Sequence, residues 1–185
     1  IIMKAKKSLG QNFIHDENFL IKLKDKIQSS NKTNIIEIGP GKGALTKHLT
    51  KKRYNKIILI EKDNNLIKYL KQYENKNIFI INADALKFNL IDLNLNKDSI
   101  IVGNLPFNVS SQLLIKWTIL NNWPPFYEKM YLMFQRELGE RIIAEKDSKS
   151  YGRISVLSQS RFNIKKLFIA PSGIFNPKPK VDGIV

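Results

Sequence analysis

Four consecutive residues, Asn104-Leu105-Pro106-Phe107, are of types that could hold the amino group of a planar base. They follow the apolar run 99–103, which predicts a strand that ends in a tight turn at one edge of a sheet. The side-chain oxygen of Asn104 and the neighbouring backbone carbonyl can accept hydrogen bonds from an amine, and Phe107 offers a flat face for a base. Because the same run is also an ordinary proline turn after a strand, its context decides between the two interpretations.

A glycine-rich turn that contains Gly39 and Gly41 follows the apolar run 34–38. Glycines allow the backbone to turn sharply and let a ligand lie close to it at the carboxyl end of a strand. Glu61, at the end of the next apolar run, could bind both hydroxyls of a ribose, and Asp84, after the third run, could accept a hydrogen bond from an adenine amine. These residues together predict an adenosine site along one sheet edge.

The glycine turn and Glu61 also fit the fingerprint of a dinucleotide-binding fold, so NAD stays possible at this point. A single acidic residue at a strand end is, besides, more often a helix cap or a surface charge. The Asn104 turn favours transfer of a group to an amine, because a nicotinamide enzyme has no use for it. A nicotinamide dehydrogenase is therefore the most distant alternative.

The elements that must position these residues alternate between apolar runs and amphipathic segments, which predicts a mainly parallel sheet covered by helices. Ser110 and Ser111 are placed to cap the helix that follows the Asn104 turn, and Pro177 and Pro179 require an extended segment near the end. Strands are predicted at 34–38, 56–60, 77–81, 98–102, 129–134, 163–169 and 181–185, and helices at 16–27, 43–52, 63–73, 109–120 and 135–146.

Composition limits the classes of function. The 185 residues fit one domain, no apolar stretch approaches the roughly 20 residues that span a bilayer, and we expect a cytoplasmic protein, or an organellar one if a transit peptide has been removed. The chain has no cysteine, and its two histidines, His15 and His48, cannot build a metal centre alone. We therefore expect no metal, no membrane contact and no zinc-dependent deaminase, with both histidines structural or on the surface.

Charge points to a polyanionic partner. Lys and Arg number 31 against 16 Asp and Glu, which gives a formal net charge of +15. A general excess of Lys, Asn and Ile explains the use of Lys in place of Arg but not the small number of acidic residues. Although each basic residue alone could be a solvated charge, the set predicts a nucleic-acid surface: Lys4, Lys6, Lys7, Arg136, Arg141, Lys146, Lys149, Arg153 and Arg161.

Five motifs in order cover nearly the whole chain: 10–13, 37–41, 104–111, 151–155 and 175–182. Together they resemble the small-subunit ribosomal RNA adenine dimethyltransferases. The resemblance implies an α/β, Rossmann-like methyltransferase fold, with a seven-stranded, mainly parallel sheet, one antiparallel strand and helices on both faces. It also implies S-adenosyl-L-methionine as cofactor, ribosomal RNA in the small subunit as partner, and dimethylation of the N6 amine of adenine as the reaction.

The resemblance also implies roles for individual residues. The catalytic turn would be Asn104, Leu105, Pro106 and Phe107, with Phe107 and Phe175 stacking on the two sides of the target adenine. Three positions depart from the family pattern without removing an essential group. This chain has Ile14 where the family usually has Leu, Phe107 where it usually has Tyr, and Gly183 where it commonly has Ser. The implied cofactor contacts are Gln11, Asn12, Ile14, Gly39, Gly41, Glu61, Asp84, Ala85 and Asn104.

We further expect residues 1–185 to form the catalytic domain, with a basic arm at about 1–15. We also expect the family's C-terminal helical domain to be absent and the protein to be monomeric. One alternative is a large-subunit adenine methyltransferase of the macrolide-resistance type; Leu105, where those enzymes have Ile, and the 151–155 motif favour the small-subunit enzyme. Another is a nucleic-acid-binding transcription factor on the same fold. The presence of Glu61, Asp84 and Asn104 together favours catalysis.

Overall fold

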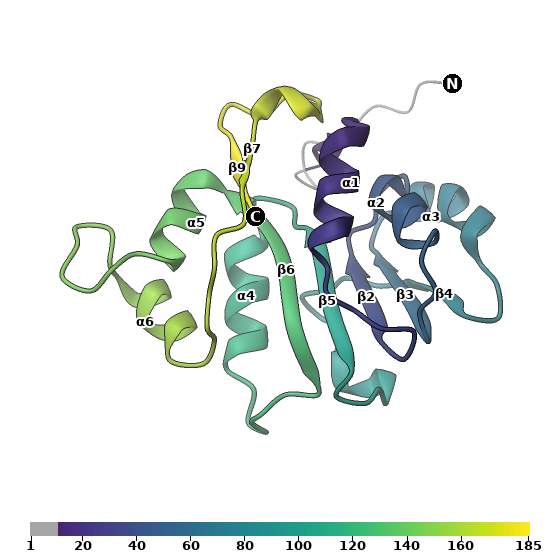
Figure 1. The fold of residues 1–185 in the computed structure, drawn as a ribbon, viewed down its shortest axis with the longest axis horizontal. Helices are drawn as coiled ribbons and strands as arrows, with labels where there is room; N and C mark the ends of the chain where they lie inside the picture. Colours follow the sequence, from purple (N-terminus) through teal and green to yellow (C-terminus); the bar gives the residue numbers. More distant parts are fainter. Residues whose placement is uncertain (1–10) are drawn as a thin grey trace.

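Five apolar runs form the parallel part of a seven-stranded sheet in the computed structural model, which describes residues 11–185 (Figure 1). Their order is β4-β3-β2-β5-β6, and every neighbouring pair is parallel. The central strands are apolar almost throughout because helices cover both faces of the sheet. The bounds are β2 (Asn34–Ile38), β3 (Lys56–Glu61), β4 (Ile78–Asn82), β5 (Ser99–Asn104) and β6 (Tyr127–Gln135).

The sheet contains one antiparallel strand, which is next to its edge strand. β9 (Gly183–Ile184) lies between β6 and β7 (Ile169–Ala170) and runs antiparallel to both. The predicted seven-stranded, mainly parallel sheet is thereby confirmed. The predicted strands 163–169 and 181–185 were too long, because β9 and β7 pair through only two residues each.

Helices cover both faces of this sheet. α1 (Glu17–Lys26), α2 (Ala44–Leu49) and α3 (Asn64–Leu70) contribute to a core with Ile35, Leu59 and Val102. Alternate strand residues such as Ile36 and Ile101 point to the other face and pack with α4 (Ser110–Thr118) and α5 (Arg136–Ile142). α6 (Arg153–Gln159), which we had not predicted, packs on α4 and α5.

Several predicted helix ends were wrong for local reasons. α2 begins at Ala44 because Gly43 has a left-handed φ of 85°, and α3 changes to a 3-10 turn at Lys71–Tyr73. Two further 3-10 turns occur at Leu90–Leu93 and Ser172–Ile174. Within residues 11–185, no helix is both long and apolar enough to cross a bilayer.

A short second sheet joins two segments that are far apart in the sequence. β1 (Phe13–Ile14) pairs antiparallel with β8 (Phe175–Asn176), with Phe13 opposite Asn176. Figure 1 shows the purple start of the described chain beside the yellow C-terminal segment. The N-terminal segment, which contains predicted cofactor contacts, is thus held against the C-terminal segment by the β1–β8 pairing. The predicted arm residues Lys4, Lys6 and Lys7 lie outside the described residues.

Candidate functional site

A cavity of about 320 Å³ lies where β2, β3 and β5 end. It is bordered by the segment before β1, the glycine turn after β2, the loop after β4 and the turn after β5. This is the edge of an open α/β sheet at which ligands bind. All nine residues predicted to contact a cofactor line it: Gln11, Asn12, Ile14, Gly39, Gly41, Glu61, Asp84, Ala85 and Asn104.

The glycine turn adopts a backbone shape that requires glycine. Gly39 and Gly41 have φ values of 65° and 63°, a region that residues with a Cβ rarely adopt. The amide of Gly41 donates a hydrogen bond to Oε2 of Glu61 at 3.0 Å, and the amide of Gly39 donates to the carbonyl of Ile60 at 2.9 Å. These two bonds fix the turn against the end of β3.

Glu61 connects three parts of the cavity wall. Its Oε1 accepts a hydrogen bond from the amide of Asp63 at 2.8 Å, while Oε2 binds the Gly41 amide. Burial raises the pKa of Glu61, although these backbone donors oppose the rise. The carboxylate thus lies at the end of β3, fixed by two backbone donors, where it can accept hydrogen bonds from the hydroxyls of a ribose.

Glu37 is a second buried acidic residue that sequence reasoning missed. Only 2% of its surface is exposed, and its Oε2 accepts a hydrogen bond from the Thr46 hydroxyl at 2.7 Å. Burial is the main cause that raises its pKa to about 7, and the neighbouring Glu61 adds to the rise. An acidic residue within the apolar run Asn-Ile-Ile-Glu-Ile was the signal in the sequence.

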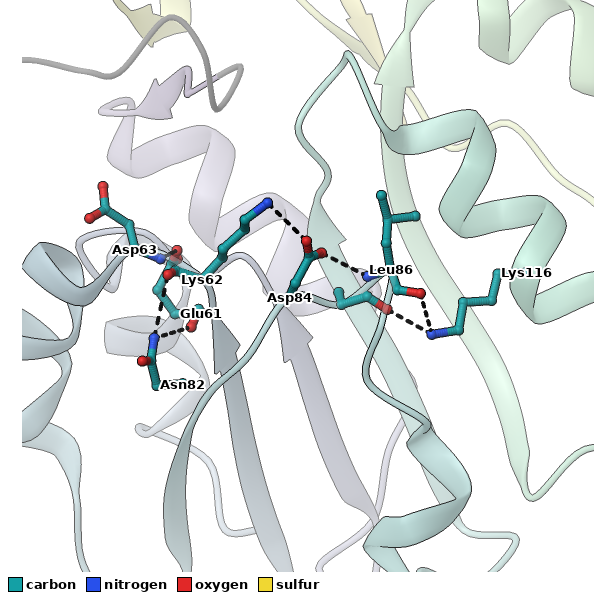
Figure 2. Close-up of polar contacts among 8 residues, drawn as sticks. Glu61, Lys62, Asp63, Asn82, Asp84, Leu86 and Lys116 are labelled. Carbon is teal, nitrogen blue, oxygen red and sulfur yellow. Dashed lines mark hydrogen bonds and ion pairs between the residues drawn. The ribbon is translucent and has the colours of Figure 1, made fainter.

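Asp84 holds the turn that follows β4. Its Oδ1 accepts a hydrogen bond from the amide of Leu86 at 3.0 Å, and its Oδ2 lies 2.8 Å from Nζ of Lys62 (Figure 2). The hydrogen bond from Lys62 is the main cause that lowers the pKa of Asp84. Asp84 is therefore an ionised acceptor at the cavity, but Lys62 already binds one of its oxygens.

Asn104 has a defined side-chain orientation. Its Nδ2 donates a hydrogen bond to the backbone carbonyl of Asn12 at 2.9 Å. Because a carbonyl only accepts, this contact assigns the nitrogen and leaves Oδ1 on the opposite side of the Cβ–Cγ axis, within the amide plane. The amide oxygen, which is the acceptor that an amine would need, thus has a fixed direction.

The predicted pair of stacking rings is not brought together as a sandwich. Phe107 lines the cavity, whereas Phe175 is 2% exposed and does not. The two ring centroids are 6.4 Å apart and the planes meet at 67°, which is an edge contact without a parallel slot for a base. The reason is the pairing of β8 with β1, which places Phe175 opposite Ile14 and within the core.

The predicted serine cap of α4 was also wrong. Val109 is the cap residue and no side chain caps this helix. Ser110 is fully buried, and its hydroxyl donates to the carbonyl of Phe107 at 3.3 Å. Since the Val109 amide donates to the Pro106 carbonyl, the helix follows directly on the Asn104 turn, and Ser110 supports that turn from inside the first helical turn.

The basic residues predicted to contact RNA lie on exposed positions around α5 and α6. Arg136 is paired with Glu140 at 2.7 Å, and the Arg161 guanidinium lies 4.8 Å from the ring centroid of Trp123. All the described members of the set are exposed: Arg136, Arg141, Lys146, Lys149, Arg153 and Arg161. Their contact with RNA stays a prediction.

The family model and two curated relatives point to the same family. A family model described as ribosomal RNA adenine dimethylase matches residues 2–185. The chain is 42% identical over 183 residues to the ribosomal RNA small subunit methyltransferase A of Pelagibacter ubique, covering 98% of this chain and 69% of the relative. For the protein of the same name from Bradyrhizobium diazoefficiens, identity is 41%, with 99% and 66% covered. The chain thus spans about two thirds of the length of these relatives.

Solved structures agree with the fold. A dimethyladenosine transferase from Plasmodium falciparum superposes with a TM-score of 0.81 at 26% identity, covering 93% of this chain and 61% of that chain. The 23S rRNA methyltransferase ErmE gives a TM-score of 0.73 at 23% identity, covering 94% and 67%. The second likeness concerns the fold alone.

Proposed function

Because the chain belongs to the ribosomal RNA adenine dimethylase family, we propose that it transfers methyl groups from S-adenosyl-L-methionine to the N6 amine of adenines in small-subunit ribosomal RNA. The observation that carries the proposal is the fixed amide of Asn104 at the edge of a cavity that also contains Glu61 and Asp84. The first residue offers an acceptor for an amine, and the two carboxylates offer acceptors for an adenosine.

The chemistry of the cavity fits this cofactor. Glu61 can accept hydrogen bonds from ribose hydroxyls, because each carboxylate oxygen retains a second lone pair beside its backbone donor. Asp84 can bind an adenine amine if it shares or releases Lys62. The glycine turn, Asn12 and Ile14 border the remaining wall. When bound, S-adenosyl-L-methionine supplies an electrophilic methyl group whose leaving group is a neutral thioether.

The chain's own contribution is positioning. The amine of adenine is a poor nucleophile because its lone pair is delocalised into the ring. Two acceptors, Oδ1 of Asn104 and the Leu105 carbonyl, would bind the two amine protons and direct the lone pair away from the ring plane. Phe107 would hold the unstacked base by its face. No strong general base is needed, because positioning of the two reactants provides most of the effect.

The choice of the small subunit rests on the relatives and not on Leu105. The side chain of Leu105 is 1% exposed and packs in the core. The curated relatives at 42% and 41% identity are both small-subunit enzymes by name. The net charge of +15 suits an RNA partner. We further propose that the chain acts as a monomer in the cytoplasm, where small subunits are assembled.

The test is transfer of labelled methyl groups to ribosomal subunits that lack the modification. The 185-residue chain is mixed with labelled S-adenosyl-L-methionine and with either small or large subunits, and its binding of the cofactor and of NAD is measured by equilibrium dialysis. We expect label in the small subunits and retention of S-adenosyl-L-methionine. Label in large subunits alone, retention of NAD in its place, or no label although the cofactor binds would contradict the proposal.

A further inference from the structure

Lys116 on α4 makes an unusually complete set of contacts. Its Nζ donates hydrogen bonds to the backbone carbonyls of Ala85, Leu86 and Phe88, at 3.0, 2.8 and 2.6 Å. Figure 2 shows Lys116 reaching the loop beside Leu86. A lysine ammonium has three donors, and all three are used here on one short loop. The side chain is partly buried, and burial lowers its pKa.

The loop needs this cation because of how its other polar groups are arranged. The amide of Leu86 donates to the Asp84 carboxylate, and the amides of Lys87 and Phe88 donate to the Asp84 carbonyl at 2.9 and 2.8 Å. The amide groups therefore gather around Asp84, whereas three carbonyls converge on the opposite side. Without a donor between them these carbonyls would repel each other and lose their hydrogen bonds.

We propose that Lys116 is a positioning residue for the adenosine end of the cofactor, because it holds residues 84–88 in the conformation that presents Asp84 and Ala85 to the cavity. The inference rests on the proposed function, in which these two residues meet the cofactor. Lys116 acts through the loop and lines no part of the cavity itself.

The same helix begins at the Asn104 turn. Ser110, its first residue, binds the Phe107 carbonyl, and Lys116 lies about two turns further along. α4 therefore supports the amine-binding turn with its first residue and the adenosine-binding loop with Lys116. Lys116 therefore couples the loop at residues 84–88 to the same helix that supports the Asn104 turn.

The test compares Lys116→Met with Lys87→Met. Methionine keeps an unbranched, apolar side chain at position 116 but removes the three donors. Lys87 is an exposed neighbour on the same loop, so its variant removes an equal charge without a carbonyl contact. Binding of S-adenosylhomocysteine is measured by calorimetry. We expect the dissociation constant of Lys116→Met to rise at least tenfold and that of Lys87→Met to stay within threefold of the wild type.

Hydrogen exchange separates positioning from general destabilisation. We expect the amides of Leu86 and Phe88 to lose protection in Lys116→Met while the amides of β2 and β5 keep theirs. If Lys116→Met does not fold, Lys116→Arg is used, because a planar guanidinium cannot direct three donors at the same convergent carbonyls. If the Lys116 variant binds S-adenosylhomocysteine as tightly as the wild type does, this inference alone is overturned. If the wild type does not bind S-adenosylhomocysteine, the proposed function is overturned.

Discussion

Single residues around the cavity owe their orientation to bonds within the protein. Asn104 is fixed by the Asn12 carbonyl, and Glu61 is fixed by the amides of Gly41 and Asp63. Acceptors that are already oriented do not need to reorganise when a ligand arrives. In the proposed function these oriented acceptors would position a base and an adenosine, which agrees with a reaction that needs no strong base.

Glu37 gives a prediction at this scale. Its pKa is about 7 in the folded chain, against an ordinary value of 4.5. Between pH 4.5 and 7, Glu37 keeps its proton in the folded chain but loses it in the unfolded chain. Its contribution to the free energy of unfolding is therefore full below pH 4.5 and is lost as the pH rises toward 7. Glu37→Gln should remove this loss, because glutamine stays neutral and its amide oxygen still accepts the Thr46 hydrogen bond.

The measurement is urea unfolding of the wild type and Glu37→Gln at several pH values from 5 to 8. Relative to the wild type, the variant should gain up to about 3 kcal/mol of unfolding free energy across this range. Glu145→Gln, at an exposed position, is the matched control and should follow the wild type. Parallel curves for the wild type and Glu37→Gln would show that Glu37 is ionised throughout.

The residues of the cavity could be predicted from the sequence only in part. Glu61, Asp84 and Asn104 each follow an apolar run, and the carboxyl ends of parallel strands share one edge, so their meeting could be expected. Lys62 and Lys116 could not be identified, because their partners lie in other elements. Phe175 was misplaced because its position depends on β8, a strand of two residues.

At the scale of elements, the contact between α5 and β9 leaves no room for a side chain at position 139 of α5. A Cβ on Gly139 would lie only 2.0 Å from Cγ2 of Ile184, which is too close for any real contact. Gly139 thus allows α5 to lie directly on β9, the short strand that joins β6 to β7. The antiparallel end of the sheet depends on this glycine.

Gly139→Ala should therefore destabilise the chain by about 1–3 kcal/mol, although alanine is the better helix former. Thermal unfolding of the variant measures the loss. Gly173→Ala is the matched control, because no atom lies within 4 Å of the position of its Cβ. Adding Ile184→Ala to Gly139→Ala should lessen the penalty of the added methyl group. A Gly139→Ala variant as stable as the control would show that α5 can move away freely.

Elements with strong periodicity were predictable, and short paired elements were not. The strand at Asn34–Ile38 was predicted with its correct bounds, because a continuous apolar run before a glycine turn is typical of a buried parallel strand. β1 and β8 are two residues each and exist only as partners of each other. α6 was missed because its seven residues carry little apolar periodicity, and its buried side chains include Ser155 and Ser158.

For the whole molecule, the excess of positive charge and the cavity would serve two parts of the same task, the binding of RNA and the selection of one base. In the proposed function the net charge of +15 would attract RNA through its phosphates, while the small cavity and Phe107 would act on one base. Sequence composition predicted the first property. The second required the fold, because the cavity is assembled from segments that span residues 11 to 176.

The most direct test of this account is analysis of the nucleosides of small-subunit RNA by mass spectrometry, after reaction with the wild type, Asn104→Ala or Asn163→Ala. We expect dimethyladenosine with the wild type and with Asn163→Ala, because Asn163 is exposed and lies outside the cavity. With Asn104→Ala we expect at least a hundredfold less product, because the amine loses a positioned acceptor. Equal dimethyladenosine from Asn104→Ala and the wild type would contradict the account.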